Sequence, residues 1–132
     1  MIRLASALGL LAALLLPQQE LHPWRWVYAA SGDDEWLVVQ GTASVRDSSG
    51  HLFAELRDDD DTSLVRITLD GLISGANVTA TVTQLDTDAD PFRATGKIAA
   101  FCPKGGKPGR QTIIVTAPGG QIIALFREIP PC

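Results

Sequence analysis

The chain has 132 residues and a formal net charge of −4, with 45% hydrophobic and 20% charged residues. This length allows one domain, and the composition excludes a disordered or fibrous chain. The acidic balance argues against a nucleic-acid partner, because phosphate contacts require a basic face. With two His and two Cys, the chain has few candidate ligands for a metal centre and few candidate nucleophiles.

The N-terminal segment has the layout of a secretory signal peptide. Arg3 precedes an uncharged apolar run over residues 4–16, and a polar break begins at Pro17. The run is shorter than the about 20 residues that a transmembrane helix needs. We therefore predict a signal peptide over 1–19 and a single periplasmic or secreted domain over 20–132, with no stable membrane span after cleavage. A buried N-terminal helix and an uncleaved anchor are the alternatives.

After this segment, short β-prone runs are separated by turn residues every eight to twelve positions, which is typical of an all-β sandwich or barrel. Several runs alternate apolar and polar side chains, so each should bury one face in an antiparallel sheet. In one of them, Val65, Ile67 and Leu69 are expected to share the buried face. The eight predicted strands are 24–30, 36–46, 51–57, 64–70, 77–85, 92–101, 112–117 and 121–128.

The connections between these runs are short, so strands that follow one another should pair. We predict an all-β fold, an eight-stranded antiparallel meander closed into a small barrel, which leaves no free sheet edge. A two-sheet β-sandwich is the alternative. Small residues inside the strands, such as Gly41 and Gly96, allow a narrow body or leave space for a ligand.

The two cysteines fit an exported protein. Cys102 ends a predicted strand, Cys132 is the last residue given, and a lone pair in an oxidising compartment usually forms a disulfide. The spacing lacks the C-x-x-C pattern of a redox-active pair. We predict a structural disulfide that holds the C-terminal tail against the barrel.

Charged residues are concentrated in the predicted loops. In a meander, alternate loops lie at the same end, and the first, third and fifth loops are all acidic. We therefore expect an acidic rim that faces a cation or a partner, formed in its third and fifth loops by Asp58, Asp59, Asp60, Asp61, Asp86, Asp88 and Asp90. The sixth loop is Gly-rich and basic, would lie at the opposite end, and is a candidate surface for an anionic partner through Lys104, Lys107 and Arg110.

Two further features bear on ligands. Clustered loop carboxylates can supply the oxygens that Ca²⁺ requires, so a Ca²⁺-binding rim is an alternative, with no other cofactor and no firm metal site expected. Asp86, Asp88 and Asp90 have the spacing that starts an EF-hand loop, but Pro91 stands where that loop needs glycine.

Trp24, Trp26 and Tyr28 share one face of the first strand and are expected to act as a lid over the core or as a ligand-stacking surface.

Catalytic patterns do not appear in the sequence. It contains no H-E-x-x-H, no G-x-S-x-G and no phosphate-binding glycine loop. We predict a monomeric, non-enzymatic binding module that contacts a protein partner through loops at one end. A small apolar-ligand carrier of lipocalin-like type is one alternative, although the G-x-W motif of that group is missing near the first strand. A structural envelope protein with a Ca²⁺-binding rim is the other.

Overall fold

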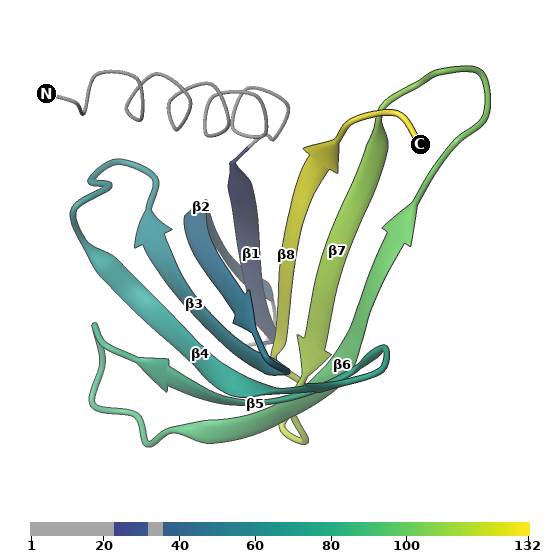
Figure 1. The fold of residues 1–132 in the computed structure, drawn as a ribbon. Coiled ribbons are helices and arrows are strands. Elements are labelled where there is room, and N and C mark those ends of the chain that lie inside the picture. The colour runs from purple at the N-terminus through teal and green to yellow at the C-terminus, as the bar shows by residue number, and fades with distance from the viewer. Residues whose placement is uncertain (1–22, 32–35) are drawn as a thin grey trace, which may run out of the picture.

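The structure is a computed structural model that describes residues 23–31 and 36–132. The predicted signal peptide and the acidic residues Asp33, Asp34 and Glu35 lie outside the described residues. The chain forms eight strands, and most of the loops that join them are short (Figure 1). They are β1 (Trp24–Ser31), β2 (Trp36–Ser48), β3 (His51–Asp58), β4 (Val65–Ser74), β5 (Asn77–Gln84), β6 (Phe92–Phe101), β7 (Gly109–Thr116) and β8 (Ile122–Ile129).

The strands form a closed antiparallel barrel in which each strand pairs with its neighbours in sequence. The barrel is completed by pairing between β1 and β8, which places Arg25 opposite Phe126 and Ala29 opposite Ile122. The prediction of an eight-stranded meander barrel is therefore confirmed, and a two-sheet sandwich is ruled out by this closing pair. Because of this closure, none of the strands β1–β8 is a free edge for pairing with another chain.

Two long strands divide the barrel into two halves. The first part of β2 pairs with β1 and its last part pairs with β3, and the two pairings overlap over residues 41–43. In the same way β6 pairs with β5 and then with β7, overlapping over residues 95–97. Gly41 and Gly96 lie at these two changes of partner, so the small residues noted in the sequence mark corners of a narrow barrel.

The two corners require glycine for steric reasons. A Cβ at Gly96 would lie 1.7 Å from the carbonyl oxygen of Ile114, and a Cβ at Gly41 would lie 2.0 Å from the carbonyl oxygen of Arg57. Real Cβ atoms do not approach backbone oxygens so closely. Both corners therefore depend on the close backbone approach that a glycine allows.

The barrel interior is filled with apolar side chains. Trp26, Leu52, Leu56, Leu69 and Leu125 are completely buried. The Nε1–H of Trp26 donates a 2.9 Å hydrogen bond to a backbone carbonyl on β3, so the polar atom of this large ring is satisfied inside the core. The described residues include no buried polar or charged residue.

The start of β4 departs from the expected alternation. Ile67 and Leu69 are buried, as predicted, but Val65 is only half-buried. The register between β3 and β4 shifts at Leu56 and Arg57, so that Leu56 pairs with Ile67 whereas Arg57 pairs with Val65. This shift is a β-bulge with one extra residue in β4. The bulge moves Val65 out of the alternation that buries Ile67 and Leu69 on the inner face of the barrel.

Candidate functional site

The connection between β6 and β7, residues 102–108, extends beyond the ends of its strands (Figure 1). We call it the basic loop. Gly105 and Gly106 have φ angles of 87° and 72°, a region that only glycine adopts freely, and they form its tip. Pro103 and Pro108 flank the glycines and restrict the backbone on either side of them.

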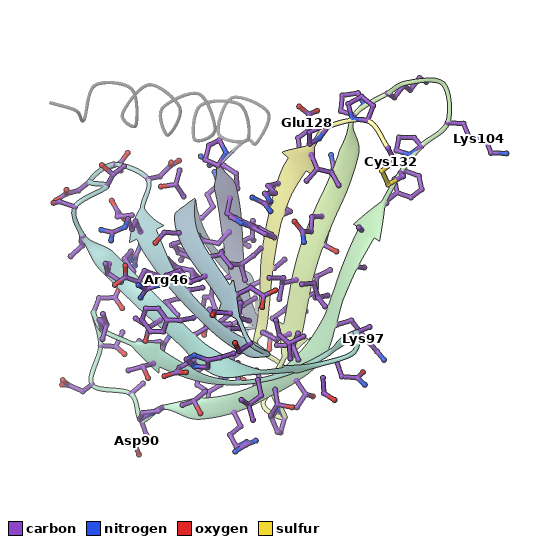
Figure 2. All side chains as sticks on the ribbon, viewed as in Figure 1. Arg46, Asp90, Lys97, Lys104, Glu128 and Cys132 are labelled. Carbon is purple, nitrogen blue, oxygen red and sulfur yellow. A yellow bond between two sulfur atoms is a disulfide. The ribbon has the colours of Figure 1, made fainter. Side chains whose placement is uncertain are left out.

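A disulfide holds the base of the basic loop. Cys102, directly after β6, is bonded to Cys132, with 5.7 Å between their Cα atoms. The predicted disulfide is therefore confirmed, and it indicates an oxidising, extracellular environment. Figure 2 shows Cys132 at the foot of the loop and Lys104 on its outer part. The C-terminal tail is thereby tied to the loop that carries the basic residues.

The cations of the basic loop, and Arg110 at the start of β7, are exposed. Lys104 and Arg110 are exposed, as is Lys107, and within the part of the chain that the structure describes none of the three forms an ion pair. The register of β7 and β8 places Arg110 opposite Glu128. The three predicted residues therefore lie in the basic loop or directly after it, at the start of β7.

A hollow of about 310 Å³ opens at the base of the basic loop. It is lined by Phe101, Pro103, Pro108, Gly109, Arg110 and Glu128. Phe101 is 67% exposed, although it is a large aromatic residue. The alternation pattern places this residue at the end of a strand but does not predict that its side chain is exposed. Aromatic residues and arginine are both enriched at protein interfaces, and Phe101 pairs with Arg110 in the β6–β7 register.

The acidic loops lie away from the basic loop. Figure 2 shows Asp90, in the β5–β6 loop, and Lys104 at opposite sides of the molecule. Arg66 joins two of the predicted acidic loops, because its guanidinium lies 3.3 Å from a carboxylate oxygen of Asp58 and 2.8 Å from one of Asp86. The structure therefore brings these two loops together across the start of β4.

Other contacts engage the carboxylates of Asp59 and Asp61 in the β3–β4 loop. Asp59 forms an ion pair with Arg25 at 3.4 Å. Hydrogen bonds from the hydroxyl and the backbone N–H of Ser63 lower the pKa of Asp61. Asp58 accepts hydrogen bonds from the backbone N–H groups of Asp60 and Asp61. Among the described residues, no group of three or more His, Cys, Asp or Glu side chains is arranged to hold a metal ion.

The predicted aromatic residues of β1 belong to the core. Trp24 and Tyr28 are each 7% exposed and Trp26 is fully buried, so their rings do not form a surface platform for a ligand. The guanidinium of Arg127 covers the ring of Trp24, with 4.6 Å to the ring centroid. Burial lowers the pKa of Arg127.

The structure also has a groove on its outer surface, lined by both polar and apolar residues, that sequence reasoning missed. It lies over β3, β4, β5 and the beginning of β6 and has a volume of about 530 Å³. The sequence shows threonines on the outward-facing positions of these strands. Which of them lie beside one another and beside the exposed Leu72 depends on the strand register, which the sequence does not give.

Comparison of the chain with family models, with curated proteins and with solved structures finds no significant match. Within the described ranges there is no helix long and apolar enough to cross a membrane.

Proposed function

We propose that this chain is a periplasmic or secreted, non-enzymatic binding module that contacts a protein partner through the basic loop and the hollow at its base. The observation that carries the proposal is the exposed ring of Phe101 beside Arg110, at a hollow of about 310 Å³. Lys104 and Lys107 add positive charge at the rim of this surface. The partner we infer presents an acidic surface with an apolar side chain that enters the hollow.

The anchoring of this surface supports the proposal. A loop that is ordered before binding loses less conformational entropy when it binds. The Cys102–Cys132 disulfide and the two flanking prolines restrict the basic loop in the free protein. The unpaired cations would accelerate association with an acidic partner, and salt should weaken that acceleration.

The alternatives from the sequence receive less support. A carrier for an apolar ligand requires space inside the barrel, whereas large side chains such as Trp26 and Leu69 pack there. A Ca²⁺-binding rim requires carboxylates that converge on one point, whereas Arg66 contacts both Asp58 and Asp86.

Photo-crosslinking tests the proposal. The full chain, exported by its native host, would carry a photoreactive phenylalanine analogue in place of Phe101 or, as a matched control, in place of Val38, which is 58% exposed on β2. We expect a protein that is crosslinked from position 101 and not from position 38. Identification by mass spectrometry should reveal an acidic protein.

A charge variant completes the test. Replacing Lys104, Lys107 and Arg110 by Gln should remove the crosslink from position 101, while thermal melting shows that the variant is folded. A crosslink that persists in this variant, or equal crosslinking from positions 38 and 101, would contradict the proposal. So would the absence of any crosslinked protein.

A further inference from the structure

The outer groove is a second surface, on the opposite half of the barrel from β7 and β8. Its larger part lies over β3–β6 and contains Phe53, Asp70 and Arg93. A second hollow of about 300 Å³ shares His51 and Phe53 with it and continues to Arg46 on β2. Because the two hollows share two residues, we treat them as one groove that runs across the strands.

The strand register explains how distant residues meet in this groove. Phe53 pairs with Arg46 on one side and with Asp70 on the other, Asp70 pairs with Thr81, and Thr81 pairs with Arg93. The row therefore crosses five strands. At about 4.8 Å between neighbouring strands, the path around the barrel wall from the backbone of Arg46 to that of Arg93 is about 19 Å long.

The row has one cation near each end and the carboxylate of Asp70, in contact with His51, in the middle. Arg93 forms no ion pair or side-chain hydrogen bond within the described chain. Arg46 lies over the ring of Phe53, with 5.1 Å to its centroid, and likewise has no ion pair there. Asp70 is 2.5 Å from Nε2 of His51. Each guanidinium can therefore bind an incoming carboxylate with two parallel hydrogen bonds.

The floor and walls between the two arginines are rich in hydroxyl groups. Thr68, Thr79, Thr81 and Thr83 line the larger hollow. In the described residues these four hydroxyls make no side-chain hydrogen bonds, so each can both donate and accept one. Such a surface satisfies a ligand that is itself rich in hydroxyl groups.

Two apolar residues complete the groove. Leu72 is 66% exposed, and Phe53 lines both hollows. They offer contact for the C–H faces of a ring, which is the combination of apolar and hydrogen-bonding surface that a sugar requires. A lipid chain would stay in contact with water in this open groove. A nucleic acid would need more than two cations along its backbone.

We propose that the outer groove binds a short acidic oligosaccharide. Its carboxylates contact Arg46 and Arg93, and its hydroxyl groups bond to the threonines and to Asp70. The C–H face of a ring packs on Phe53. This site is independent of the basic loop, and a single protein could use both, one for a protein partner and the other for a glycan.

Nuclear magnetic resonance of the isotope-labelled full chain tests the proposal. The probes are oligosaccharides of galacturonate, of alginate and of hyaluronate, a neutral malto-oligosaccharide, and citrate as a hydroxyl-poor anion. We expect at least one acidic oligosaccharide to shift amide signals of β3–β6, with an affinity about tenfold above those of the neutral chain and of citrate. Absence of shifts for all three acidic probes at millimolar concentration would overturn the proposal.

Two variants test the chemistry of the groove. Replacing both Arg46 and Arg93 by Gln should weaken binding of the acidic oligosaccharide about tenfold, and replacing Thr81 by Val should weaken it several-fold. The matched control, Arg25→Gln on β1 with Thr116→Val on β7, lies outside both proposed sites and should bind like the wild type. Equal weakening by the control, wild-type binding by both groove variants, or equal affinity for citrate would overturn the proposal. Melting temperatures verify that each variant is folded.

Discussion

Replacement of Gly96 by Ala tests whether the close backbone approach at a barrel corner is essential for the fold. The added Cβ would lie 1.7 Å from the carbonyl oxygen of Ile114, 2.7 Å from its carbonyl carbon and 2.8 Å from the Cα of Val115. All three are backbone atoms, so no side-chain rotation can relieve the contact. The only relief is to separate β6 from β7.

The size of the effect follows from these distances. A carbon and a carbonyl oxygen in contact are normally at least about 3.3 Å apart, so the two strands would have to separate by about 1.6 Å. This movement breaks two or three ladder hydrogen bonds, and each contributes about 1 kcal/mol to stability. The loss of about 2–3 kcal/mol should lower the melting temperature by about 10 °C, since 1 kcal/mol corresponds to about 4 °C in a domain of this size.

Thermal melting followed by circular dichroism measures this loss, and Gly75→Ala is the matched control. Gly75 has a φ of +62°, and a Cβ added there would have no atom within 4 Å, so alanine adds strain of about 1 kcal/mol without a clash. Gly41→Ala, at the other corner, should resemble Gly96→Ala. A melting temperature for Gly96→Ala equal to or above that of Gly75→Ala would refute the reasoning.

Three further predictions concern other contacts. Replacing Cys102 and Cys132 by Ser should cost at most about 3.6 kcal/mol, estimated from the sequence separation of 30, and a reductant should lower the melting temperature of the wild type only. Trp26→Phe leaves a carbonyl on β3 without its donor and should cost about 1–3 kcal/mol, measured by urea unfolding. Ser63→Ala should raise the pKa of Asp61, measured by carboxyl-carbon titration. Because the folded-state pKa is lowered, the wild type should be more stable than this variant at neutral pH, and the difference should vanish as the pH falls through that pKa.

The barrel could be predicted from the sequence because its strands alternate clearly and its connections are short. Strand ends were less predictable, because tertiary pairing extends them beyond the apolar pattern. β4 continues to Ser74, which pairs with Asn77, and β7 starts at Gly109, which pairs with Ile129. The bulge that leaves Val65 half-buried has no sign in the alternation itself, since it depends on the register with β3.

The candidate sites were predictable to different degrees. The basic loop is contiguous in sequence, so its charge could be noticed without a structure. The exposure of Phe101 could not, because an aromatic residue at a strand end is as compatible with the core as with the surface. The outer groove joins Arg46 to Arg93 across five strands, and alternation tells which face a residue occupies but not which residues lie beside it.

The closing pair of the barrel has a consequence for the folding kinetics. Every other strand pair is formed by neighbours in the chain, whereas the β1–β8 pair joins Arg25 to Phe126. Ordering the long intervening segment costs more entropy than closing a short turn. The native state is therefore completed late, in a step whose rate is set by this non-local contact, and we expect folding over milliseconds to seconds rather than microseconds. Until that step is complete, β1 and β8 are the two edges at which the folding chain can pair with another copy.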